Sequence, residues 1–220
     1  MKKLTLAVLL AAIPLLASAQ DPVKVDPGHY KVILDNDAVR VLKVRLAVGE
    51  KSPMHSHPDA IIVPLSAAKA RFTMPDGKTE GLDLVKETAA WTPASTHSPA
   101  NVGTSELDGI LVEFKSKTAG TATLPTTRPG MQYSALAETP RAVAMRATAG
   151  PDFHEPAGST HEFDQVVIGL GAADMTVAME GKPKVTTWQR GDVLYIGRGV
   201  KHESKNTGGK PVDFIVVAIR

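Results

Sequence analysis

The stretch HSPANVGTSELDGILV, residues 97–112, returns in altered form as HESKNTGGKPVDFIVV, residues 202–217. The offset between the two copies is 105, and it relates His, Asn, Gly, Asp and the apolar positions that follow them. At an offset of 104, the residues matched further upstream are His57 with His161, Gly77 with Gly181, and Trp91 with Tyr195. Repetition over this length predicts two copies of one structural unit.

The repeat divides the chain into four parts. We expect a signal peptide over residues 1–19, a first domain with an N-terminal extension over 20–117, a linker over 118–140 and a second domain over 141–220. The linker prediction depends on a composition rich in Thr, Ala, Gly and Pro, with prolines at 125, 129 and 140.

Each copy consists of short alternating or apolar segments bounded by turn residues, which is the pattern of β-strands. The segments expected to be strands are 38–47, 61–65, 69–74, 107–114, 165–170, 175–179 and 213–219. Pro75-Asp76-Gly77 and Glu180-Gly181-Lys182 occupy equivalent places and predict hairpin turns. The fold class predicted is all-β, with two tandem barrels of the double-sheet, jelly-roll kind.

The first residues have the pattern of an export signal. Lys2 and Lys3 precede an apolar run over 4–16, and Ala17-Ser18-Ala19 supplies the small residues of a cleavage site. The alternative is a membrane anchor, but the run is shorter than the roughly 20 residues that a spanning helix needs. We therefore expect a periplasmic or secreted protein that begins at Gln20 and has no membrane contact after cleavage.

Composition narrows the partners. Loss of Lys2 and Lys3 with the signal leaves 23 basic and 23 acidic residues, so the mature chain carries no net charge. Without basic runs there is no electrostatic surface for nucleic acid. The chain has no cysteine, so it forms no disulfide and a metal would have nitrogen and oxygen ligands. The expected partner is a small molecule.

Histidines cluster at the repeated positions. Of seven in the chain, the five concerned are His55, His57, His97, His161 and His202. Residues at i and i+2 of a strand share a face, so His55 and His57 would point into one barrel, with His97 arriving from another strand. Three neutral imidazoles suit Fe, Mn, Zn, Ni or Cu and leave coordination positions open. The alternative is that His55 and His57 lie in a surface loop.

These motifs resemble those of the cupin superfamily. Gly49, five residues and His55-Ser56-His57 match the first motif, but Ile61 and Ile62 stand where its Glu belongs. In the first copy, the residues that match the second motif are Pro93, Ser95, His97 and Asn101, and Glu87 replaces the leading Gly. In the second copy, the matching residues are Gly191, Gly199, His202 and Asn206. The resemblance implies two tandem double-stranded β-helix barrels, a bicupin, with a divalent transition metal as cofactor.

The departures from the motifs imply unequal sites. The first copy resembles the cupins whose metal has three His ligands, here His55, His57 and His97. In the alignment of the two copies, Ser159 is equivalent to His55, and Gln165 stands at the position of the Glu. His161, Gln165 and His202 would therefore form a weak metal site or none. We interpret Glu155 as a solvated charge, and Trp91 and Tyr195 as core residues. Asp59 could replace the missing Glu, but the Pro58-Asp59 pair is explained more simply as turn chemistry.

The resemblance implies several functions. The first is a metal-dependent enzyme, similar to non-haem iron dioxygenases, acting on a small organic substrate in the first barrel. The alternatives are a non-catalytic module that binds a metal or small ligand, and a zinc-dependent isomerase or hydrolase. Two barrels in one chain can cover each other, so we expect a monomer or a homodimer.

Overall fold

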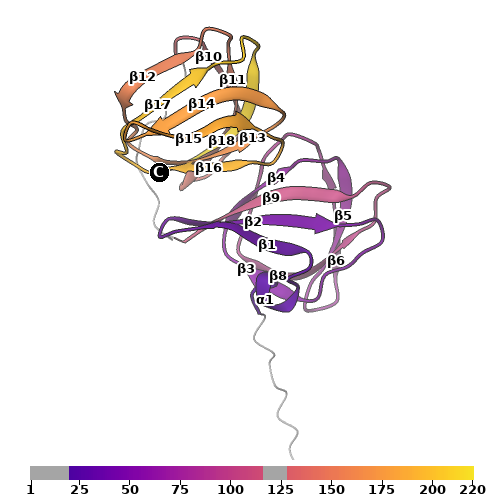
Figure 1. Ribbon diagram of the computed structural model, residues 1–220. Coiled ribbons are helices and arrows are strands. Elements are labelled where there is room, and N and C mark those ends of the chain that lie inside the picture. Colours follow the sequence, from indigo (N-terminus) through magenta and orange to yellow (C-terminus); the bar gives the residue numbers. More distant parts are fainter. Residues whose placement is uncertain (1–19, 116–127) are drawn as a thin grey trace, which may run out of the picture.

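The computed structural model describes residues 20–115 and 128–220, which are almost entirely antiparallel β-structure (Figure 1). The elements of the first unit are α1 (Pro22–Val25), β1 (Tyr30–Asp35), β2 (Val39–Leu46), β3 (His55–His57), β4 (Ala60–Pro64), β5 (Ala68–Thr73), β6 (Thr79–Leu84), β7 (Ala90–Thr92), β8 (Ser95–Asn101) and β9 (Leu107–Phe114). The predicted signal, 1–19, lies outside the described residues. Within those residues, no helix has the length and apolarity to cross a membrane.

The second unit repeats this series of strands. Its elements are β10 (Met131–Glu138), β11 (Ala142–Ala149), β12 (His154–Ser159), β13 (Asp164–Gly169), β14 (Ala173–Met179), β15 (Lys182–Trp188), β16 (Val193–Ile196), β17 (His202–Asn206) and β18 (Val212–Ile219). All of the strand segments expected from the sequence are present, with ends that differ by a residue or two.

Each unit is a roll of two sheets. In the first, a five-stranded sheet in the order β1-β2-β9-β4-β7 faces a four-stranded sheet in the order β3-β8-β5-β6. The second unit has the same arrangement, β10-β11-β18-β13-β16 and β12-β17-β14-β15. The all-β prediction with two tandem barrels is confirmed, and the order of the strands shows that the two copies share one topology.

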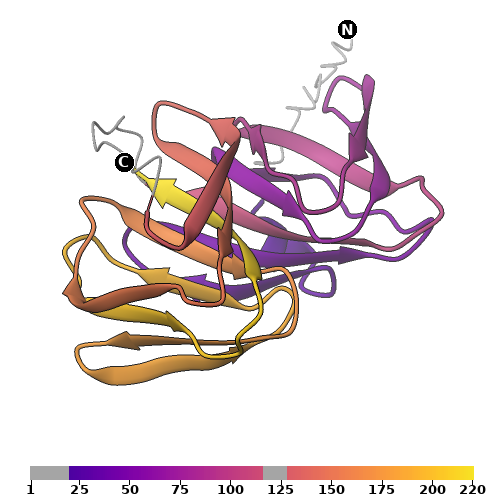
Figure 2. The same ribbon diagram turned by 90° about the horizontal axis from the view of Figure 1, so that it is seen from above.

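The barrels pack against each other through their five-stranded sheets, and Figures 1 and 2 show them in contact from two directions. The apolar core between them takes the same positions from both copies: Val39 and Ala142, Val41 and Ala144, Ile61 and Val166, Val63 and Ile168, Leu65 and Leu170, Ile110 and Ile215, Val112 and Val217, Phe114 and Ile219. Burial of each large aliphatic side chain contributes about 1.5–3 kcal/mol, so this core holds the two barrels in one body.

Strand registers correct the sequence alignment of the copies. Ala60 pairs with Glu113, and Gln165 pairs with Ala218 in the equivalent ladder, so Gln165 corresponds to Ala60 and not to Ile61. Ile61 faces the core between the barrels. The position of the expected Glu is therefore held by the inward-facing Ala60 in the first barrel.

The expected linker also differs from the structure. Residues 131–138 form β10, which pairs along its length with β11 and is the counterpart of β1. The second unit therefore begins before residue 141. Residues 116–127 of this region lie outside the described part of the chain.

Left-handed backbone explains two features of the sequence. Gly181 (φ +73°) and Glu180 (φ +52°) turn the β14–β15 hairpin as predicted, with consecutive positive φ angles of the kind found in tight hairpins. Gly191 (φ +86°) and Glu87 (φ +60°) are equivalent, so the position requires a left-handed residue in both copies. Glu87 takes the strained conformation that Gly adopts without cost.

Candidate functional site

The first barrel gathers the three predicted histidines on its four-stranded sheet. His55 and His57 lie on β3, His97 lies on β8, and His55 is paired directly with His97 across the strands. All three are buried, and the His97 ring centroid lies 5.2 Å from that of His55 and 4.9 Å from that of His57. The histidines therefore form an interior cluster and do not lie in a surface loop.

Backbone carbonyls orient two of these rings. His55 Nδ1 lies 2.8 Å from the Pro53 carbonyl oxygen, and His57 Nδ1 lies 2.7 Å from that of Pro58. A carbonyl only accepts, so each Nδ1 carries the proton and each Nε2 keeps its lone pair. This is how proteins prepare histidine for a metal. His97 instead places Nδ1 3.2 Å from Ser95 Oγ.

Burial favours the uncharged form of two of these rings. Loss of solvent, together with the neighbouring His57 and His55, lowers the pKa of His97 to about 3. Burial also lowers the pKa of His55. Neutral imidazoles are the form that coordinates a metal, so near neutral pH protons do not compete with a cation at His55 and His97.

A cavity of about 380 Å³ opens onto the three histidines. Its lining is mainly apolar and comes from both sheets, and includes Val44, Leu46, Ile62, Phe72, Leu82, Leu84, Leu107 and Leu111. The volume is that of a small-molecule site. An apolar wall with one polar end would hold a small organic molecule in one orientation.

Trp91 does not pack as expected, and Asp59 has partners of its own. Trp91 lines the cavity but is 50% exposed, so the prediction that it packs in the core is wrong. Its equivalent Tyr195 packs against the core between the barrels and donates to Asp164. Asp59, considered as a substitute base for the missing Glu, is paired with Arg141 and accepts from the Ala94 amide.

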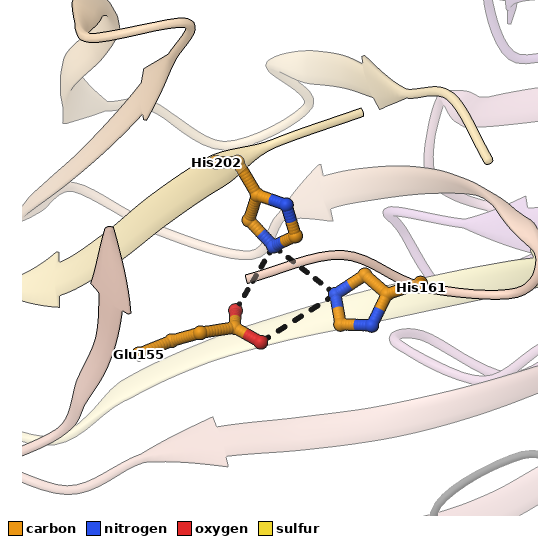
Figure 3. A group of neighbouring side chains, drawn as sticks. All are labelled: Glu155, His161 and His202. Atoms are coloured by element: carbon orange, nitrogen blue, oxygen red, sulfur yellow. Dashed lines mark hydrogen bonds and ion pairs between the residues drawn. The ribbon is translucent and has the colours of Figure 1, made fainter. Parts of the chain in front are cut away.

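A second cluster lies in the second barrel (Figure 3). His161 Nε2 lies 3.1 Å from His202 Nε2, which lies 3.1 Å from a Glu155 carboxylate oxygen. One possible ligand atom from each residue lies within 4.8 Å of the others. Among the described residues this is the one group of three His or acidic side chains that meets that distance, so the first-barrel histidines do not converge as closely.

Glu155 was missed by the sequence reasoning. Its carboxylate is partly buried against His202 and Arg128, and although burial raises its pKa, the His202 contact and the Arg128 charge lower it overall. The sequence offered a signal, since Glu155, Ser159 and His161 are separated by even numbers of residues and so could share one face of a strand. The shift in register between Glu155 and Ser159, where Gly158 has φ +88°, hid it.

Gln165 was predicted to join His161 and His202. It is buried on β13 with the parity of Val167, which packs against the second-barrel core, so it faces the interior. Neither histidine makes a hydrogen bond to Gln165 within the described residues. The structure places Glu155, which comes from β12, next to both.

The interior of the second barrel holds larger rings. Strand pairing makes Trp188 the counterpart of Leu84, and Phe214 that of Gly109. Trp188 is buried, donates through Nε1 to the Met175 carbonyl and contacts Phe214, with ring centroids 6.1 Å apart. Trp188 thus fills the second barrel at the position where the smaller Leu84 lines the cavity of the first.

Comparison with known proteins gives matches in structure alone. No family model and no curated sequence matches the chain. AerE from Microcystis aeruginosa, at 14% identity, matches 92% of this chain and 97% of its own with a TM-score of 0.66. Salicylate 1,2-dioxygenase from Pseudaminobacter salicylatoxidans, at 11%, matches 83% of this chain and 71% of its own with a TM-score of 0.61. Oxalate decarboxylase from Lactobacillus farciminis, at 11%, matches 83% and 77% with a TM-score of 0.59.

The chain has a bicupin fold. At these identities the similarity concerns the fold, and a fold supports many reactions. The clusters in the two barrels differ in ligand type and surroundings. One is an all-histidine cluster beside a cavity, and the other includes a carboxylate and an arginine.

Proposed function

We propose that this bicupin is an exported, metal-dependent enzyme that acts on a small organic molecule in the first barrel. A divalent transition metal, Fe, Mn, Zn or Ni, would be held by His55, His57 and His97. One observation carries the proposal, namely that a largely apolar cavity ends on three buried histidines.

The residue types present suit such a metal, although the three histidines do not converge as closely as the second-barrel cluster. Two of the three imidazoles keep a lone pair on Nε2 by donating through Nδ1 to a carbonyl, although Nε2 of His57 lies 3.2 Å from Ser95 Oγ, a contact that a metal would replace. Burial favours the neutral ring of His55. A metal bound there would supply Lewis-acid chemistry, or oxygen-dependent redox chemistry if it were iron. The chain itself would contribute a cavity that binds and orients the substrate and limits the access of water.

Oxygen-dependent cleavage is the reaction class we favour. Three neutral ligands leave positions for substrate and O2, and one bicupin of similar fold is a salicylate 1,2-dioxygenase. Among the described residues, no carboxylate that could act as a base is hydrogen-bonded to the three histidines, although Glu80 lines the same cavity. A reaction driven by metal redox chemistry needs such a base less than a hydrolysis does.

Elemental analysis of the mature protein, purified from the compartment to which it is exported, tests the metal. We expect the His57→Ala variant to lose the first-barrel ion, while His161→Ala retains it. With Fe(II) loaded anaerobically, an oxygen electrode then screens small aromatic and diketone substrates for uptake of O2. Retention of all metal by His57→Ala would contradict the proposed site.

The Leu84→Trp variant tests whether the substrate binds in the first-barrel cavity, because it leaves the three histidines unchanged. It places in the first barrel the side chain that the second barrel has at this position, and it should fill part of the cavity. We expect substrate turnover to fall at least about tenfold while metal content is unchanged. Unaltered turnover would show that the substrate binds elsewhere.

A non-catalytic binding module is the second candidate. The absence of a hydrogen-bonded carboxylate beside the first-barrel histidines, within the described residues, favours it. Such a module would bind metal and small molecules in the cavity, but would neither consume O2 nor alter the ligand, as mass spectrometry of the recovered ligand would show.

A further inference from the structure

Arg128 is the fourth member of the second-barrel cluster. Its guanidinium donates to Glu155 through one nitrogen, and its Nη2 lies 2.7 Å from His161 Nδ1. A longer contact of 3.4 Å joins the same nitrogen to His161 Nε2. A positive side chain thus lies against two of the three possible metal ligands.

The Arg128 contact fixes where His161 carries its proton. A guanidinium has five donors and no acceptor, so Nδ1 of His161 must accept from it. A neutral imidazole that accepts at Nδ1 carries its hydrogen on Nε2. Nε2 is the atom that points toward His202 and Glu155, so His161 presents N–H where a metal would need a lone pair.

His202 carries its hydrogen on the other ring nitrogen, Nδ1. Its Nδ1 lies 3.1 Å from the Val200 carbonyl oxygen, so Nδ1 donates, as in His55. Nε2 of His202 then faces both His161 Nε2 and Glu155, each at 3.1 Å. One ring nitrogen cannot both accept from His161 and donate to Glu155. A cation bound between the three residues would accept electron pairs from all of them.

We propose that Glu155, His161 and His202 form a second metal site, separate from that of the first barrel, which Arg128 keeps closed. For a metal to bind, the His161 proton moves from Nε2 to Nδ1. The guanidinium cannot accept that proton's hydrogen bond, so it must leave, and its charge would also repel the arriving cation. When Arg128 is in place, its positive charge pairs with the Glu155 carboxylate, as a bound cation otherwise would.

The ligands set the class of metal. Two imidazole nitrogens and one carboxylate oxygen suit Zn²⁺, Fe²⁺ or Mn²⁺, and leave positions for water. The carboxylate comes from β12, upstream of the position that the sequence motif assigns to it. The second-barrel site therefore differs from the first-barrel site in the net charge of its ligands. It also contains Arg128, which competes with a metal ion for Glu155 and His161.

Zinc titration against a chromophoric chelator tests the proposal, with the full mature chain in a His57→Ala background that weakens the first-barrel cluster. We expect Arg128→Met, which keeps the length but donates nothing, to bind Zn²⁺ at least about tenfold more tightly than the background. Adding Glu155→Gln or His161→Ala to this variant should remove the gain.

Two further variants separate charge from proton position. Arg128→Gln removes the charge but keeps a donor for His161 Nδ1, so it should gain less affinity than Arg128→Met. Arg198→Met makes the same change of charge at an exposed position of the same barrel, and should gain nothing. Equal or weaker binding by Arg128→Met, or a gain that survives His161→Ala, would overturn the proposal.

A measurement without substitution of Arg128 guards against loss of folding. Long-range ¹H–¹⁵N spectra of the metal-free chain, with His161 assigned from the spectrum of His161→Ala, report which ring nitrogen carries hydrogen. We expect hydrogen on Nε2 before zinc and on Nδ1 after it. Hydrogen on Nδ1 in the metal-free protein would refute the mechanism, whether or not the first barrel proves to be an enzyme site.

Discussion

His29 is held at both ring nitrogens by carboxylates. Nδ1 lies 2.8 Å from Asp26, and Nε2 lies 3.0 Å from Glu50 on the turn after β2. Burial lowers the pKa of His29, but the hydrogen bonds to Asp26 and Glu50 outweigh it and raise the pKa overall. Protonated His29 therefore ties the segment before β1 to that turn.

The raised pKa predicts a pH-dependent stability. The contribution of His29 is fully present below its ordinary pKa of about 6.5 and is lost as the pH rises through the raised value in the folded protein. Thermal unfolding should separate wild type from His29→Gln most at about pH 5.5 and least at about pH 9. His154→Gln is the control, since His154 contacts one carboxylate, that of Glu203. A difference that grows toward alkaline pH would contradict this account.

For single residues, the sequence predicted which side chains lie inside a barrel better than it predicted which side chains they contact. The spacing of His55 and His57 on one strand, with His97 on another, was enough to place them together in the barrel interior. Glu155 and Arg128 were not foreseen, because their contacts depend on the path of the backbone around Gly158 and on a residue from the expected linker. Metal binding by either cluster stays a prediction.

Among the elements, the turn before β16 shows how the repeat encodes structure. Gly191 has φ +86°, and a Cβ there would lie 2.9 Å from Leu65 Cδ1 and 3.3 Å from Lys43 Nζ, both in the other barrel. Glycine is needed for the backbone conformation and for the close approach of the barrels. Glu87, its counterpart, satisfies the turn with strain.

Gly191→Ala should lower the free energy of unfolding by about 2–3 kcal/mol, from a left-handed alanine and a crowded Leu65. Gly209→Ala is the matched control, because its φ is +67° and nothing lies within 4 Å of the added carbon. That variant should lose only about 1 kcal/mol. Equal losses in urea denaturation would show that contact between the barrels contributes nothing.

The strands expected from alternation and turn residues are present, but others were not among the segments expected, and β10 was predicted to be part of a linker. The segment that forms β10 contains small and polar residues, and it lies between Pro129 and Pro140. Composition alone therefore indicated a linker. Pairing with β11 gives this segment its structure, and a local pattern carries little information about such a partner.

At the scale of the molecule, the core between the barrels makes one cooperative unit of two domains. Ile61→Ala removes a buried side chain of that core and should cost about 2–5 kcal/mol. The chain has one tryptophan in each barrel, Trp91 and Trp188, so the Trp91→Phe and Trp188→Phe variants each report one barrel by fluorescence. We expect both probes to shift together in urea. A shift of the first-barrel probe alone would show that the barrels unfold independently.

The sequence repeat predicted two barrels, but it did not predict the surface between them. Val and Ile at alternating positions of central strands are buried on both faces, and composition does not say which face meets the partner barrel. The register supplied that answer, and it also moved the equivalence of Gln165 from Ile61 to Ala60.

The core between the barrels also bears on descent. Since both copies contribute the same positions, an ancestor with one barrel would expose an apolar sheet unless two identical chains met through it, as in a symmetric dimer. Fusion of the two genes would replace dependence on protein concentration with the effective concentration that a tether provides. The sequence of each barrel could then diverge while the two barrels stayed associated in one chain. The open cavity with three histidines and the ring-filled barrel with Arg128 are the kind of divergence that such a fusion permits.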